Sequence, residues 1–226
     1  MGDPGGVVLL HGHGRLGGSM MRLAGAARRA GYATFAPSYP YRRPLDGIVQ
    51  WLAPRIEAFE QGFTGPLHIV THSLGGLVAR AFIEVHAPRR LGRVVMLGPP
   101  NAGSELADLL FRLRLGRWFL GGTGVHLRTG RTTEHEAMLG AVHYPIGIIA
   151  GDRSLLPVPA PMLPRPHDGK VSIAATHVAG LTDHMVLPVT HTLMVYDRRV
   201  IAAVLAFLAE GSFGRAMPRP VDQEVQ

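Results

Sequence analysis

Residues 66–79 read PLHIVTHSLGGLVA, and this stretch decides the fold. Its first half is apolar and β-branched, which predicts a buried strand, and beyond Gly76 the apolar residues recur at helical spacing. Ser73 lies at the corner between strand and helix, with small residues two positions before and two positions after it. This arrangement is typical of a nucleophile elbow, G-x-S-x-G, where small flanks leave room for a strained serine backbone.

One position departs from that pattern. Thr71 stands where the first glycine usually does, so a β-branched side chain must fit into the turn. Gly75 and Gly76 keep the other side open, and a helix that begins there directs its N-terminal amides toward the serine. The competing interpretation makes Ser73 a helix-capping residue after a core strand.

Strands and helices alternate along the rest of the chain. Further strands are predicted at 6–10, 32–37, 93–97, 144–150 and 183–189, and helices at 19–29, 45–61 with an interruption at Pro54, 75–86, 104–115 and 197–210. This alternation predicts an α/β fold with a mostly parallel sheet and helices on both faces. At 226 residues, 46% of them hydrophobic and 17% charged, the chain fits a single domain over residues 1–226.

Two segments fall outside this alternation. Residues 101–142 form an apolar, helical insert where a cap over the site is expected. In it Arg112, Arg114 and Arg117 are interspersed with apolar residues, a pattern that suits peripheral contact with a lipid surface and equally suits a helix packed on the core. Residues 215–226 are expected to form an exposed, flexible tail.

Composition and charge narrow the function classes. The chain has no cysteine, and its 12 histidines never form H-x-x-x-H on a predicted helix, so neither thiolate chemistry nor a metal site is predicted. The net charge of +7 favours anionic surfaces, but no basic and aromatic motif predicts a nucleic-acid partner. No apolar window approaches about 18 residues, so no membrane span is predicted. The sequence fits a cytoplasmic protein or a secreted one whose leader has been removed, and does not distinguish them.

Candidate site residues follow the predicted strands, and in parallel sheets the site lies at the carboxyl ends of strands. The first strand ends in a glycine-rich loop around His13, where backbone amides are open to a ligand. His191 follows the last strand and precedes the last helix. Asp152 directly follows a strand, Asp168 opens the sequence DGKV, and Asp183 lies at the amino end of a strand.

These motifs resemble the α/β-hydrolase superfamily, and more narrowly the small bacterial serine lipases and esterases. The resemblance runs from Val7 to about Phe213 and rests on LLHGHGR, VTHSLGG, HDGKV and PVTHT. It implies an α/β-hydrolase fold with the family's order of nucleophile, acid and histidine along the chain.

Carried over by residue, the resemblance implies Ser73 as nucleophile, His191 as general base, and the backbone N–H groups of His13 and Leu74 as the oxyanion hole. Asp168 is favoured as the acid, because the sequence around it is similar to the family's acid loop. Asp152 remains open, and Asp183 is less favoured because it opens its strand. The side chain of His72, inside the elbow, is expected to point away from the nucleophile's side.

The implied activity is hydrolysis of carboxylic esters, of the carboxylesterase or triacylglycerol lipase type, through an acyl-enzyme and without a metal or organic cofactor. Small-molecule or lipid esters are the expected substrates. The alternatives are an acyltransferase, a phospholipase or deacylase with the same triad, or a catalytically silent binding module. Arg15, beside the glycine-rich loop, either steadies a substrate carboxylate or phosphate or forms a structural ion pair.

Overall fold

The computed structural model describes residues 3–155 and 163–214, and a six-stranded sheet runs through its centre. All strands are parallel, in the order β2-β1-β3-β4-β5-β6. This confirms the predicted α/β fold and its parallel sheet. The strands are β1 Gly6–Leu10, β2 Ala33–Phe35, β3 Leu67–His72, β4 Leu91–Leu97, β5 Ile146–Gly151 and β6 Asp183–Leu187.

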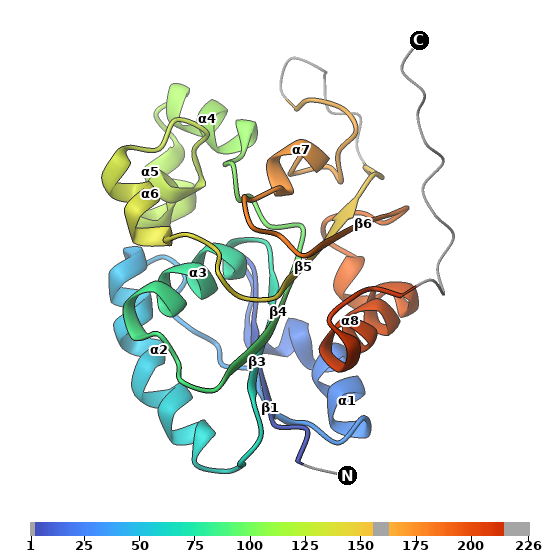
Figure 1. Ribbon diagram of the computed structural model, residues 1–226. Helices are drawn as coiled ribbons and strands as arrows, with labels where there is room; N and C mark the ends of the chain where they lie inside the picture. The colour runs from blue at the N-terminus through green and yellow to red at the C-terminus, as the bar shows by residue number, and fades with distance from the viewer. Residues whose placement is uncertain (1–2, 156–162, 215–226) are drawn as a thin grey trace.

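Helices cover both faces of the sheet (Figure 1). On one face lie α2 (Leu45–Glu60) and α3 (Leu74–His86), and on the other α1 (Met21–Arg29) and α8 (Arg198–Glu210). Successive strand residues point to opposite faces, so β1 sends Val8 and Leu10 into the core beneath α2 and α3, and Val7 and Leu9 into the core beneath α1 and α8. The short 3-10 helices η1 (Gly17–Met20) and η3 (Met194–Tyr196) and helix α7 (Ile173–Thr176) complete the frame.

Helix α2 corrects one prediction. We expected Pro54 to interrupt it, but α2 is continuous from Leu45 to Glu60 with Pro54 inside. Proline removes one backbone N–H and leaves the carbonyl of Gln50 without its helical partner. Both residues are exposed, so water can satisfy that carbonyl while the buried face of α2 remains packed.

The segment between β4 and β5 is helical and lies over the carboxyl ends of the strands (Figure 1). It consists of α4 (Glu105–Arg112), α5 (Gly116–Leu120), η2 (Gly121–Leu127) and α6 (Thr133–Leu139). We call residues 101–142 the insert.

One arginine attaches the insert to the core, and a second holds the insert together internally. Arg80 of α3 donates from Nη2 to the carbonyl of Gly140 at 2.8 Å, and Arg131 donates to the carbonyls of Asn101 and, at 3.0 Å, His126. The predicted tail, residues 215–226, lies outside the described residues. Within the described ranges, no helix has the length and apolar character needed to cross a bilayer.

Candidate active site

Ser73 occupies the turn between β3 and α3 in a conformation that L-residues rarely adopt, with φ 53° and ψ −122°. Its N–H donates to the carbonyl of Leu97 at 2.8 Å, and its carbonyl accepts from the N–H of Gly76 at 2.9 Å. A Cβ at Gly75 would lie 2.4 Å from the carbonyl oxygen of Leu10, so this position tolerates no side chain. The surrounding backbone therefore holds the serine in its strained turn.

Thr71 fits where a glycine is usual. Its side chain is fully buried, and its Oγ1 lies 3.6 Å from the point where a Cβ of Gly76 would be. A Cβ at Gly76 would also lie 2.9 Å from Cβ of Pro99. The need for a bare residue at position 76 therefore comes from Pro99, whereas the threonine is only at ordinary contact distance.

His191 and Asp168 form a buried pair. Nδ1 of His191 lies 2.6 Å from Oδ2 of Asp168, and the two residues are 3% and 2% exposed. A carboxylate only accepts hydrogen bonds, so Nδ1 carries the proton and Nε2 of the neutral ring remains free to accept one. The N–H groups of Lys170 and Val171 donate to Oδ1 of Asp168 at 3.0 and 2.9 Å and fix the carboxylate.

Gly98, at the end of β4, makes room for this pair. Its φ is +53°, and a Cβ there would lie 3.0 Å from Oδ2 of Asp168 and 3.1 Å from Nδ1 of His191. The structure brings neither of the other two carboxylates to His191. Asp152 pairs with Arg153 at 3.3 Å, and Asp183 accepts from the N–H of Phe213 at 2.8 Å.

The loop after β1 lies against the elbow. The hydroxyl of Tyr39 donates to the carbonyl of His11, and the two rings stack with centroids 4.1 Å apart. A Cβ at Gly12 would lie 3.1 Å from Cβ of Ser73. Across residues 3–155 and 163–214, the backbone N–H groups of His13 and Leu74 donate no hydrogen bond.

Ser73 and His191 line one cavity of about 150 Å³. Its floor is polar, with His13 and His72 beside them, and its walls come mainly from the insert. The remaining lining residues are Pro100, Ser104, Leu106, Ala107, Leu110, Leu120, Leu127, Lys170 and Val171. The arrangement brings a serine and a histidine together in a cavity whose other walls are largely apolar.

His72 corrects a second prediction. We expected its side chain to point away from the nucleophile's side, but it packs against His191, with ring centroids 4.9 Å apart. Nε2 of His72 lies 2.8 Å from the carbonyl oxygen of His191, so Nε2 carries the proton and donates. Burial and the neighbouring His191 hold the pKa of His72 well below its usual range, and the ring is neutral. The contact joins residues 119 positions apart in sequence, so no local pattern predicts it.

Two cations flank the buried pair. Arg15 donates from Nη2 to the carbonyl of Thr192 at 3.2 Å and belongs to no ion pair among the described residues, so the predicted structural ion pair is wrong. Lys170, which we did not single out from the sequence, lines the cavity with an exposed side chain. Partial desolvation and the nearby Arg15 lower the pKa of Lys170. Sequence reasoning had used it only as part of the acid-loop motif.

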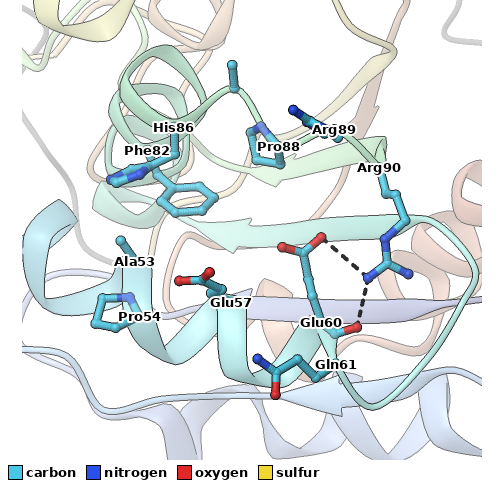
Figure 2. A pocket seen from close by; sticks show the side chains of 11 residues that line it. Ala53, Pro54, Glu57, Glu60, Gln61, Phe82, His86, Pro88, Arg89 and Arg90 are labelled. Atoms are coloured by element: carbon cyan, nitrogen blue, oxygen red, sulfur yellow. Dashed lines mark hydrogen bonds and ion pairs between the residues drawn. The ribbon is translucent and has the colours of Figure 1, made fainter.

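A larger hollow, of about 720 Å³, lies away from these residues between α2 and the chain that joins α3 to β4 (Figure 2). Its charged residues serve the backbone: Arg90 donates to the carbonyls of Glu60, Phe63 and Gly65 at 2.7 to 3.0 Å. Its lining includes no serine, threonine or cysteine. Among the described residues, no group of three or more His, Cys, Asp or Glu side chains is arranged to hold a metal ion.

Comparisons with known proteins show which folds this chain is similar to. Residues 48–118 match a family described as a domain of unknown function, DUF7379, and the search of curated proteins found no match. The Bacillus licheniformis lipase BlEst2 in its mature form is 19% identical with a TM-score of 0.71, covering 90% of this chain and 91% of the lipase.

Two further solved structures are similar. One, from work on the metagenome-derived lipolytic enzymes LipS and LipT, is 16% identical with a TM-score of 0.63, over 93% of this chain and 95% of that one. Phospholipase PlaB from Legionella pneumophila is 18% identical with a TM-score of 0.54, over 76% of this chain and 44% of the phospholipase. The likeness to the mature lipase covers 90% of this chain, and the chain has the α/β-hydrolase fold that its motifs resemble.

Proposed function

We propose that the protein is a serine hydrolase that cleaves carboxylic esters through an acyl-enzyme. One observation carries the proposal: the strained Ser73 shares a cavity with His191, whose Nδ1 lies 2.6 Å from Oδ2 of Asp168. A serine hydroxyl is a weak nucleophile until an imidazole of fixed tautomer takes its proton. The Asp168 carboxylate supports that tautomer by accepting from Nδ1.

In the proposed reaction, Oγ of Ser73 attacks the ester carbonyl while Nε2 of His191 takes the serine proton. The N–H groups of His13 and Leu74 donate to the oxyanion. The tetrahedral intermediate then collapses, the C–O bond to the alcohol breaks, and His191 returns the proton to the leaving alcohol. Water repeats the sequence on the acyl-enzyme and releases the carboxylic acid.

The walls of the cavity support acyl esters as substrates. Leu106 and Leu110 of α4, with Leu120 and Leu127 from the rest of the insert, present hydrocarbon to the space above Ser73. An apolar acyl chain gains free energy by leaving water for such a wall, about 0.8 kcal/mol for each buried CH₂. We expect p-nitrophenyl esters of medium acyl chain length to be turned over fastest, and a rate series from acetate to palmitate measures this.

The decisive test uses Ser73→Ala with p-nitrophenyl esters and a fluorophosphonate probe. We expect kcat to fall by about 10⁶-fold and the probe to label wild type only, because the covalent step needs the hydroxyl. Ser19→Ala is the matched control, since Ser19 lies on η1 outside the cavity, and should keep both activity and label. Undiminished turnover by Ser73→Ala would sink the proposal, and so would a wild type that is neither labelled nor active on any ester of the series.

A further inference from the structure

An apolar surface is exposed on the insert, where α4 turns into α5. Four large side chains lie within seven residues: Leu113 is 57% exposed, Leu115 42%, Trp118 70% and Phe119 44%. The two aromatic rings contact each other edge to face, with centroids 4.4 Å apart. Such a cluster costs free energy in water, and clusters of this kind mark sites that meet another apolar phase.

The turn is built so that these side chains face outward. Gly116 is buried against the ring of Phe111, where a Cβ would lie 2.5 Å from a ring carbon. Arg42 donates to the carbonyls of Trp118 and Phe119 at 2.6 and 3.2 Å and holds their backbone on the protein. Backbone is anchored while the rings remain in solvent, which is the geometry of a preformed surface.

Along the chain, the charged side chains interspersed with these four residues have one sign. Arg112, Arg114 and Arg117 are exposed among them and belong to no ion pair of the described residues. From residue 109 to residue 133 the sequence contains no aspartate or glutamate. Interleaved arginines and bulky apolar side chains match a layer whose outside is anionic and whose inside is hydrocarbon.

The surface is continuous with the walls of the cavity. Leu110 precedes it on α4 and Leu120 follows it on α5, and both line the space above Ser73. A lipid surface in contact with Trp118 would therefore lie next to the slot into which we propose that an acyl chain enters. This placement is the part of the argument that rests on the proposed function.

We propose that Arg112, Arg114 and Arg117, with the four exposed apolar residues, dock the protein on membranes that contain anionic phospholipids. The apolar side chains enter the boundary between head groups and acyl chains, and the arginines pair with lipid phosphates and anionic head groups. Binding itself does not need the proposed reaction, so each proposal can fail without the other.

The chain offers its own reporter, since it has two tryptophans, Trp51 and Trp118. We would measure Trp118 emission in the variant Ser73→Ala/Trp51→Phe, which does not hydrolyse the vesicles under the proposed function. Vesicles of phosphatidylcholine and phosphatidylglycerol should shift the emission to the blue, and high salt should reverse the shift because it screens the charges. Pure phosphatidylcholine should give a much smaller shift.

Two triple variants with equal charge change separate specific docking from general basicity. Arg112→Gln/Arg114→Gln/Arg117→Gln should lower partition onto anionic vesicles by about a hundredfold, at about fivefold for each arginine. Arg22→Gln/Arg29→Gln/Arg89→Gln, on exposed residues of other elements, should leave it unchanged.

Three results would overturn the proposal: no blue shift with anionic vesicles, equal partition by the two triple variants, or a lipid-independent shift that grows with protein concentration. The last would assign the surface to a second copy of the chain.

Discussion

The two hollows of this protein differ in a way that size does not reveal. The larger, of about 720 Å³ between α2 and the start of β4, is lined by charges that satisfy backbone carbonyls (Figure 2). The smaller, of about 150 Å³, lies at the carboxyl ends of the strands and holds a strained serine beside a buried histidine and carboxylate. Strain and buried polar pairs cost free energy, so their concentration in one cavity indicates a site under functional constraint. A choice by volume alone would have taken the larger hollow as the candidate site.

The largest effect that tests this comparison is expected at Asp168. We expect Asp168→Asn to lower kcat on p-nitrophenyl esters by about 10⁴-fold, because an amide at this position favours the wrong tautomer of His191. Asp152→Asn and Asp183→Asn are the matched controls and should retain nearly full activity. A greater loss in Asp152→Asn than in Asp168→Asn would transfer the acid role to Asp152.

A second test lowers the pH and concerns a buried histidine of the insert, which lies over the smaller hollow. His126 of the insert is 4% exposed, and burial, helped by His135 and Arg131, lowers its pKa to about 4. The unfolded chain, with a histidine pKa near 6.5, binds more protons between these two values, so the free energy of unfolding falls as pH falls from about 6.5 to about 4.

We expect this histidine to account for a loss of about 1–3 kcal/mol over that window. His126→Gln should therefore flatten the dependence of the free energy of unfolding on pH, measured by urea denaturation. The exposed His143 provides the control variant His143→Gln, which should keep the wild-type slope. An unchanged slope in His126→Gln would contradict the assignment.

The third test concerns the histidine that sequence reasoning misplaced. His72→Phe removes the donor to the carbonyl of His191, and we expect kcat to fall about fivefold with little change in KM, since a neutral hydrogen bond is worth about 1 kcal/mol. His72→Gln retains a donor at the end of the side chain and should recover most of the rate. Equal loss in both variants would mean that ring packing, and not the hydrogen bond, positions His191.

The smallest effect is expected in the larger hollow. Arg90→Leu removes donors to three backbone carbonyls that border solvent, and we expect the free energy of unfolding to fall by about 1–2 kcal/mol with kcat unchanged. Urea denaturation and ester turnover on one preparation measure both quantities. A fall in kcat with an unchanged free energy of unfolding would mean that the larger hollow takes part in the reaction. The difference between the two hollows would then not hold.

The sequence predicted the strands, the helices and their order well, and the directions of individual side chains less well. The elbow could be predicted because Ser73 lies between a strand and a helix whose patterns are both strong. Asp168 could be favoured over Asp152 only through resemblance, because the contact with His191 joins residues 23 positions apart in sequence. Periodicity carries no information on such pairs.

The misses have identifiable physical causes. The direction of His72 goes with its contact to His191, 119 positions away in sequence, which no local pattern contains. The continuity of α2 through Pro54 depends on which side of the helix faces water. The insert was predicted as helical, but the side chains that it contributes to the cavity follow from how α4, α5 and η2 are placed relative to one another, which has no periodic signal.

Gly98 shows how strongly such a site can depend on the absence of a side-chain carbon. Both Oδ2 of Asp168 and Nδ1 of His191 approach the place that a methyl group would fill. The end of β4 contributes empty space, and no other residue type can supply it at that left-handed backbone. Related proteins could therefore replace most of the insert and keep the contact between Asp168 and His191. Even an alanine at position 98 would push these two side chains apart.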